Sequence, residues 1–569
     1  MSFSTGSTRT FQLLESIVDP INGIWGALPG DDGRQDGGCR MMTRWTAGAI
    51  LTTAALAFGG AVHTTRVSAA GITSCENLAS LALPDATITS AQLVAAGAFT
   101  PPGPSRSGVT PVVARGGAAP RAGAPSYGSL PAFCRIAATL KPTSDSDIKM
   151  EVWLPASGWN GRFQAVGNGG WAGTISYAAL ASAVAAGYAG ASTDTGHEGN
   201  SAQFAVGHPE KIVDFAYRSV HEMTVKAKAI IQAHYGQPPA TSYWNGCSQG
   251  GRQGLAEAQR YPADFDGIVA GASAWNNMQL HAGRIALNQM VNASPDSYIP
   301  PSKYPMIHEA VLKACDRLDG VEDGVLENPA QCHFDPQVLQ CKGVDDQTCL
   351  TGAQVTAARA MYASIKHPKT GEVVYPGLRP GSELVWGVTG GPEPVGTALE
   401  GLKYVVFGDA AWDWHRFNLA TDLDRAIKND KGILATNDAN LKPFFDRGGK
   451  LLLYHGWTDT QVAPDQSVIY FSKVIDRVGK SAAGNSIQLF MVPGMNHCQG
   501  GAGTDNFDKM ATIAQWTQTG KAPDRIVASH LTDGRIDRTR PLCPYPQVAT
   551  YMGSGSTNDA ANFVCKLQN

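Results

Sequence analysis

The segment Gly246-Cys247-Ser248-Gln249-Gly250 constrains the fold more than any other part of the chain. A strand-like run at 241–245 precedes it and a helix-like run at 250–260 follows it. The chain must therefore turn sharply at Ser248, and glycines on both sides permit a tight turn. Such a turn lifts a serine hydroxyl to a helix N-terminus, where free N–H groups favour a developing anion. With 64 glycines in the chain, the pattern alone fits an ordinary turn equally well.

Strand-like and helix-like segments alternate on both sides of this turn. Apolar runs at 450–454 and 487–492 are bounded by turn residues, as buried parallel strands are, and 211–234 has helical periodicity. This alternation predicts an α/β protein, with a parallel sheet flanked by helices. Further strands are expected at 148–154, 162–166, 188–192 and 265–270.

The alternation stops between about 273 and 440, where many Asp and Gly residues, several Trp and four cysteines gather. We interpret this stretch as a large lid domain inserted between late strands of the core. The expected domains are an upstream extension plus signal peptide at 1–70, the first part of the core at 71–272, the inserted lid at 273–440, and the second part of the core at 441–569.

Residues 41–70 have the pattern of an export signal. Arg44 precedes an apolar stretch from about 47 to 62, and small residues at 67–70 offer cleavage sites. A membrane anchor is the alternative, but the apolar stretch is short and rich in Ala, Gly and Thr. Met41 or Met42 is then the expected start of translation. We expect a secreted or periplasmic protein.

The charged residues argue against two classes of partner. The net charge is −3, and lysines and arginines are dispersed along the sequence. The chain therefore has no basic stripe for nucleic acid and no polybasic patch for a membrane surface. We expect a small-molecule or polysaccharide partner instead, and the sequence does not determine an oligomeric state.

Eleven cysteines are present, and Cys39 lies in the upstream extension. The ten that remain are an even number in a chain expected to be exported, which favours disulfides over reduced core thiols. The chain has no C-x-x-C pair, which argues against a zinc site.

Two loops offer partners for Ser248. Asp459 follows the apolar run at 450–454, and His497 follows the run at 487–492. The order Ser, Asp, His is that of α/β-hydrolases, and reactive groups of parallel sheets gather at the carboxyl ends of the strands. His497 is expected to take the proton of Ser248, while Asp459 orients the imidazole. The alternative is that both are ordinary loop residues.

Cysteines adjoin both the predicted nucleophile and the predicted base. Cys247 precedes Ser248 and Cys498 follows His497. If their neighbours meet, the two cysteines are well placed for a disulfide across the site, provided the geometry suits one. Two independent buried thiols are the alternative.

Taken together, these features resemble the tannase/feruloyl esterase family, which includes feruloyl esterases, tannases and mono(hydroxyethyl) terephthalate hydrolases. The resemblance covers residues 75–569. It is carried by the segment Gly167-Asn168-Gly169-Gly170-Trp171-Ala172-Gly173, the Cys247-Ser248 pair, the Asp459 loop and His497-Cys498. It implies an α/β-hydrolase core with an inserted lid and a serine esterase activity.

The resemblance also implies roles for further residues. Backbone N–H groups of Gln249 and of a glycine in the early loop, Gly170 in preference to Gly169, would form an oxyanion hole. A structural calcium ion would be bound by the loop 316–325, whose clustered aspartates could otherwise be a solvated acidic turn. The implied calcium ligands are Asp316, Asp319, Val321, Asp323 and Val325. The remaining implied disulfides are Cys75–Cys134, Cys315–Cys332, Cys341–Cys349 and Cys543–Cys565.

The expected function is hydrolysis of aromatic carboxylic esters of the feruloyl or hydroxycinnamoyl type, through an acyl-enzyme on Ser248. The substrate would be a small aromatic ester or an ester-decorated polysaccharide. Tannase activity on galloyl esters and terephthalate monoester hydrolysis are alternatives, and a non-catalytic calcium-dependent binding protein is a further one. The expected acyl pocket lies in the lid, with Trp386, Trp412 and Trp414 as a candidate aromatic wall and Arg379 as a candidate cation for a substrate carboxylate.

Overall fold

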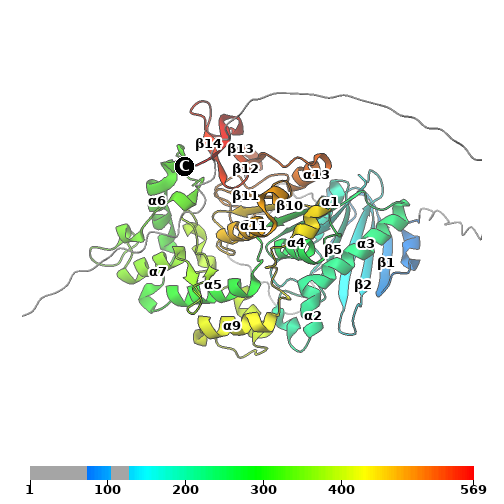
Figure 1. Cartoon of the computed structure of the whole chain (residues 1–569), viewed down its shortest axis with the longest axis horizontal. Helices are drawn as coiled ribbons and strands as arrows, with labels where there is room; N and C mark the ends of the chain where they lie inside the picture. Colours follow the sequence, from blue (N-terminus) through cyan, green and yellow to red (C-terminus); the bar gives the residue numbers. More distant parts are fainter. Residues whose placement is uncertain (1–72, 104–126, 569) are drawn as a thin grey trace, which may run out of the picture. The chain divides into compact units, whose positions relative to one another are not determined.

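A computed structural model describes residues 73–103 and 127–568 of the chain (Figure 1). The export signal expected at 41–70 lies outside the described residues. Within them, every helix is too short or too polar to cross a lipid bilayer.

A nine-stranded sheet forms the core, in the order β1-β2-β3-β5-β4-β6-β7-β10-β11. The pairs from β1 to β5 are antiparallel, and the pairs from β5 through β11 are parallel. The strands are β1 (Ala86–Val94), β2 (Phe133–Leu140), β3 (Ile148–Pro155), β4 (Arg162–Val166), β5 (Ala189–Thr193), β6 (Thr241–Cys247), β7 (Gly267–Gly271), β10 (Lys450–Gly456) and β11 (Ile487–Val492). The predicted α/β class is confirmed, and the predicted strands match within a few residues.

Helices cover both faces of this sheet, because its central strands are apolar on both sides. In β10, Leu451 and Leu453 belong to the same apolar cluster as residues of α3, α4 and α11, whereas Leu452 and Tyr454 belong to the cluster on the opposite face, with residues of α13. The helices are α1 (Tyr177–Ala185), α2 (Pro209–Val213), α3 (Ser219–Tyr235), α4 (Gln249–Arg260), α10 (Lys442–Asp446), α11 (Asp465–Val478), α12 (Lys480–Ala483) and α13 (Lys509–Thr519). The helix expected at 211–234 is divided in the structure by a π-helical turn at 214–218.

The segment between β7 and β10 adds no strand to the nine-stranded sheet. Its helices bury their own cluster of apolar side chains, which includes Trp386 and extends to Trp171 and Phe215 of the core. Figure 1 shows these helices, in green and yellow, beside the sheet. The elements are α5 (Asn277–Val291), α6 (Tyr304–Cys315), α7 (Gly352–Tyr362), β8 (Ile365–Lys366), β9 (Val373–Tyr375), α8 (Gly396–Glu400) and α9 (Leu419–Asp430).

Two hairpins follow the sheet at the C-terminal end of the described chain. They are β12 (Ile526–Thr532) with β13 (Arg535–Leu542), and β14 (Gln547–Tyr551) with β15 (Phe563–Leu567). Five disulfides join cysteines of the described residues, in the same pairs that the sequence and the family resemblance led us to expect: Cys75–Cys134, Cys247–Cys498, Cys315–Cys332, Cys341–Cys349 and Cys543–Cys565.

Candidate active site

Ser248 lies at the sharp turn between β6 and α4. Its backbone has φ 62° and ψ −121°, a conformation that residues with a side chain rarely adopt. The surrounding backbone holds it there: the Ser248 N–H donates to the carbonyl of Gly271, and the Ser248 carbonyl accepts from Arg252. A strained backbone held by its neighbours is typical of functional positions.

The glycines around Ser248 are required by close packing of backbone on backbone. A Cβ atom at Gly246 would lie 2.4 Å from the carbonyl oxygen of Gly250. A Cβ at Gly250 would lie 3.0 Å from the carbonyl oxygen of Asn168, in the early glycine-rich loop. The turn and the loop therefore pack against each other because both lack side chains at the contact.

The structure joins the other two predicted catalytic residues by a hydrogen bond. Nδ1 of His497 lies 2.6 Å from Oδ2 of Asp459. The Asp459 side chain is fully buried, and that of His497 is 14% exposed. Burial alone would raise the pKa of Asp459, but the charge of His497 and hydrogen bonds from His455 and His497 outweigh it and hold the pKa well below its ordinary value. Asp459 is therefore an anion that can orient the imidazole.

Two groups that the sequence did not single out hold Asp459 in place. Backbone N–H groups of Gln461 and Val462 donate to Oδ1, at 2.7 and 3.0 Å. His455, fully buried on β10, lies with Nε2 3.0 Å from Oδ2 and with Nδ1 2.7 Å from the hydroxyl of Ser467. The only sequence signal for His455 is its place near the end of the apolar run, four residues before Asp459.

The Cys247–Cys498 disulfide connects the Ser248 turn to the His497 loop, with 6.0 Å between the two Cα atoms. Among the described residues, no hydrogen bond joins the Ser248 hydroxyl to His497. Catalytic hydrogen bonds of a free enzyme are often long and tighten only when substrate binds. The covalent link therefore fixes which loops face each other.

A cavity beside Ser248 contains both predicted oxyanion-hole residues. Gly170 and Gln249 line it together with Ser248 and Trp171. Gly170 has φ +52°, which favours glycine, and the indole N–H of Trp171 donates to the carbonyl of Thr397 in the inserted segment. Asn168 holds the loop by donating to the carbonyls of Thr174 and Thr193. The loop is thus fixed beside the serine.

The remaining walls of this cavity come from α5, from Ala274 and Thr397, and from residues near Asp459; those of α5 include His281 and Arg284. None of the three candidate tryptophans lines it. Trp386 is buried against Tyr362, Trp412 stacks on Phe407, and Trp414 stacks on His415. The aromatic wall expected from these residues is therefore not formed at this cavity.

Arg379 does not line this cavity either. Its guanidinium forms two hydrogen bonds with the carboxylate of Asp465, at 2.7 and 2.6 Å. Arg284, which lines the cavity, was missed because a single arginine in a helix carries no motif.

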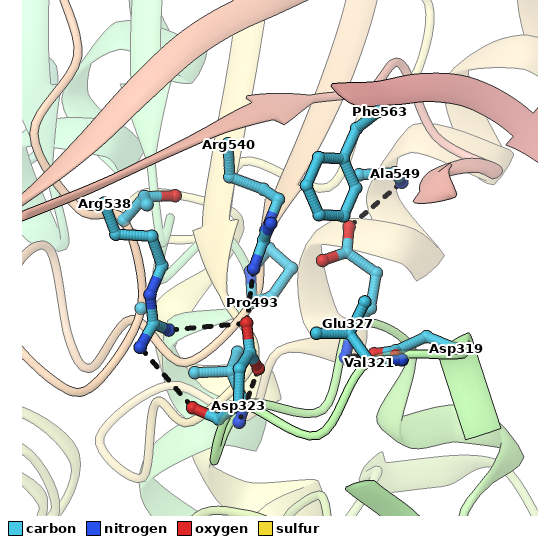
Figure 2. Close-up of a pocket in the computed structure, with 12 residues that line it drawn as sticks. Asp319, Val321, Asp323, Glu327, Pro493, Arg538, Arg540, Ala549 and Phe563 are labelled. Carbon is cyan, nitrogen blue, oxygen red and sulfur yellow. Dashed lines mark hydrogen bonds and ion pairs between the residues drawn. The ribbon is translucent and has the colours of Figure 1, made fainter. Parts of the chain in front are cut away.

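The loop at 316–325 curls through two glycines in the left-handed conformation, Gly320 and Gly324. Figure 2 shows Asp319 and Asp323 on this loop, facing Glu327 and the two arginines of β13. Asp319 accepts from the backbone of Val321 and Glu327, and Asp323 pairs with Arg540 and, at 3.6 Å, with Arg538.

The chemistry of this loop fits calcium, which prefers carboxylate and carbonyl oxygens. Oδ1 of Asp316 is buried without a hydrogen-bond partner. Burial, with a smaller contribution from the charges of Asp323 and Asp316, raises the pKa of Asp319 to about 6. Arg538 and Arg540 compensate Asp323 alone. The three carboxylates are not among the described side-chain groups whose ligand atoms all lie within 4.8 Å of one another, and Asp323 is paired with Arg540. Calcium binding by these residues and by the carbonyls of Val321 and Val325 therefore stays a prediction.

A family model described as "Tannase and feruloyl esterase" matches residues 134–566. The chain belongs to the tannase and feruloyl esterase family. An uncharacterised esterase of Xanthomonas campestris pv. campestris is 36% identical, over 91% of this chain and 94% of its own. A "Probable feruloyl esterase B" of Aspergillus clavatus is 34% identical, over 79% of this chain and 89% of its own.

A solved structure supports the same family assignment. The crystal structure of feruloyl esterase B from Aspergillus oryzae superposes with a TM-score of 0.79 at 31% identity, covering 86% of this chain and 99% of that one. The predicted α/β-hydrolase fold and the predicted family are confirmed, and this member of the family is a carboxylic ester hydrolase.

Proposed function

We propose that this protein is an exported serine esterase that hydrolyses esters of aromatic carboxylic acids, of the feruloyl or hydroxycinnamoyl type. The observation that carries the proposal is the buried Asp459–His497 hydrogen bond on a loop that a disulfide ties to the Ser248 turn. The substrate class is supported by relatives named as feruloyl esterases, two-thirds or more of whose length this chain covers.

In the proposed reaction, Nε2 of His497 takes the proton of the Ser248 hydroxyl as Oγ attacks the ester carbonyl. Asp459 stabilises the imidazolium, and the backbone N–H groups of Gln249 and Gly170 stabilise the oxyanion. His497 then donates its proton to the departing alcohol, which leaves an acyl-enzyme on Ser248. Water, activated by the same imidazole, hydrolyses the acyl-enzyme and restores the serine.

A panel of esters tests this proposal. We expect turnover of methyl ferulate, and methyl gallate and a terephthalate monoester test the two alternative activities within the family. Ser248→Ala should lower kcat by about 10⁴-fold or more while circular dichroism and melting temperature stay close to wild type. Full activity in that variant would refute the role of Ser248. If disulfide-bonded wild-type protein hydrolysed none of the three, a calcium-dependent binding function would replace the esterase proposal.

Two further features belong to the same proposal. A calcium ion would be held by Asp316, Asp319, Val321, Asp323 and Val325, where its charge would stabilise the loop rather than take part in the reaction. Secretion or passage to a periplasm is supported by the five disulfides, because such bonds form in oxidising compartments.

A further inference from the structure

A histidine and two carboxyl groups meet at the C-terminal end of α4. Glu257 lies in the last turn of α4, Asp264 in the loop between α4 and β7, and His221 in the first turn of α3. One nitrogen or oxygen atom from each of these three side chains lies within 4.8 Å of those from the other two. Nine helical residues separate Glu257 from Ser248, so this cluster lies about 14 Å along α4 from the proposed nucleophile.

Glu257 is fully buried, and neither oxygen of its carboxyl group has a hydrogen-bond partner. No other buried carboxyl group of the described residues lacks a partner at both oxygens. Glu383 and Asp459 are buried to the same degree, but each accepts hydrogen bonds from several donors. A buried carboxylate without donors is costly to folding, so Glu257 needs a cation or a proton.

The other two side chains of the cluster are held in fixed positions and reach solvent. Nδ1 of His221 lies 2.6 Å from Oδ2 of Asp264. The imidazole also stacks on the ring of Tyr261, with 3.8 Å between the centroids and 7° between the planes. The side chains of His221 and Asp264 are 27% and 12% exposed, so the cluster opens to solvent on their side. An ion can enter there, and water can complete its coordination.

The cations near the cluster bind other acceptors. Lys228 donates to the backbone carbonyl of Asp264, and the guanidinium of Arg252 donates to three neutral oxygens. Burial, with the charge of Asp264, raises the pKa of Glu257 well above its ordinary value, although the charges of Lys228 and Arg252 oppose this shift. The negative end of the α4 dipole also favours a cation at this position.

From this geometry we propose that His221, Glu257 and Asp264 bind a divalent transition-metal ion of the Zn²⁺ class, with water in the fourth position. One imidazole nitrogen and two carboxylate oxygens are ligands that Zn²⁺ accepts in a tetrahedral site. Zinc–ligand distances of about 2.0–2.2 Å place the ligand atoms about 3.3 Å apart, which small side-chain rotations reach from the observed separations. Calcium, which takes about six to eight oxygen ligands, fits this set less well.

The bound ion connects three segments of the core: the start of α3, the end of α4, and the loop that leads into β7. It stabilises the folded state, because a ligand that binds only the folded protein shifts the unfolding equilibrium by mass action. The missing C-x-x-C pair argues against cysteine-ligated zinc alone, and this site uses no cysteine. The ion lies too far from Ser248 to contact an ester there, so the inference does not depend on the esterase proposal.

Titration of the disulfide-bonded protein with Zn²⁺ tests the site. The protein is first dialysed against EDTA and returned to excess Ca²⁺, so that the candidate calcium loop does not compete for zinc. We expect calorimetry to show one tight Zn²⁺ per chain, and saturating Zn²⁺ to raise the melting temperature by about 3 °C. Co²⁺ in its place should give the intense visible absorption of a four-coordinate ion. A wild-type protein that takes up no zinc would overturn the inference, and Glu257 would then share a proton with Asp264.

Variants locate the ion. His221→Gln and Glu257→Gln should each weaken zinc binding by about tenfold or more, and abolish the melting shift. His530→Gln is the matched control and should bind zinc as wild type does, because His530 also pairs with an aspartate, Asp537 at 2.8 Å, but belongs to no three-ligand cluster of the described residues. Equal zinc affinities of His221→Gln and His530→Gln would overturn the inference. If the variants do not fold, anomalous diffraction from zinc-soaked wild-type crystals decides: a peak between the three side chains supports the site, and peaks only elsewhere refute it.

Discussion

The ring of His197 holds the glycine-rich loop at 167–173 in place through a hydrogen bond. Nε2 lies 2.8 Å from the carbonyl oxygen of Trp171, so this nitrogen carries the proton, and the ring stacks on Phe204. A Cβ at Gly173 would lie 2.2 Å from the carbonyl oxygen of His197, which shows how closely loop and histidine pack. Burial, with a smaller contribution from the charge of Lys211, lowers the pKa of His197 to about 4.

A pH dependence of stability follows from this pKa. As pH falls from about 6.5 to about 4, the unfolded chain binds a proton at residue 197 that the folded state does not accept, so the contribution of His197 to the free energy of unfolding decreases. Asp194, whose pKa burial raises to about 7, acts in the opposite direction over an overlapping range. The pH dependence of the free energy of unfolding of the wild-type protein alone therefore does not isolate the contribution of His197.

The comparison with His197→Gln isolates the histidine. The variant should be less stable than wild type at pH 7, and the gap should narrow as the pH falls, by up to about 1.4 kcal/mol per pH unit in the middle of the range. Urea unfolding midpoints at pH 7, 6, 5 and 4.5 measure the gap. A gap that stays constant would show that His197 titrates normally.

At the scale of elements, the candidate calcium loop connects α6 to the C-terminal hairpins. Asp323 pairs with Arg540 on β13, and the carboxylate of Glu327 accepts from the N–H of Ala549 on β14 (Figure 2). The Cys315–Cys332 disulfide closes the same loop. A cation here would neutralise carboxylates that are now partly buried together, and would so stabilise the contact between the inserted segment and the hairpins.

Chelation tests the calcium site. Dialysis against EDTA should lower the melting temperature by about 5 °C, and added Ca²⁺ should restore it, because an ion that binds only the folded state stabilises it by mass action. The double variant Asp316→Asn, Asp319→Asn should melt lower and respond to neither treatment. Asp346→Asn, an acidic residue outside the loop, is the control and should respond as wild type does. A wild-type melt that EDTA does not change would argue against the ion.

At the scale of the whole molecule, the Cys247–Cys498 disulfide joins residues 251 positions apart and connects β6 to the loop after β11. Hydrogen bonds between the strands set the approximate places of these loops, but the strands do not restrain a loop beyond their ends. A misplacement of about 1 Å between reacting groups can cost about 10²-fold in rate. The bridge therefore restrains the positions of Ser248 and His497 relative to each other.

Removing this bridge should affect catalysis more than removing another. The double variant Cys247→Ala, Cys498→Ala is expected to lose about 100-fold in kcat and to melt at a lower temperature. The variant Cys341→Ala, Cys349→Ala removes a bridge between cysteines eight positions apart in the inserted segment and should keep kcat within about twofold. Initial rates with methyl ferulate and thermal melts compare the two. Equal losses of kcat would show that the first bridge has no special role.

The sequence by itself determined the fold class and the places of the proposed triad, and its resemblance to a known family implied the cysteine pairs. The fold class and the triad positions follow from local features: a strand that ends at Gly-Cys-Ser-Gln-Gly, and loops after two apolar runs that carry Asp459 and His497. In a parallel sheet, the carboxyl ends of the strands share one edge, so local positions already imply proximity. The catalytic roles of these residues remain predictions.

Only the tertiary structure decided which side chains share the cavity with Ser248. From sequence, Arg379 was the candidate cation and Arg284 carried no signal, yet Arg379 pairs with Asp465 and Arg284 lines the cavity with a free Nε edge. His455 and the tryptophans of the inserted segment were equally undetermined. The physical reason is that a side chain is free or paired according to partners far away in the chain, such as Gln461, which lies 177 residues from Arg284, and sequence patterns describe only neighbours.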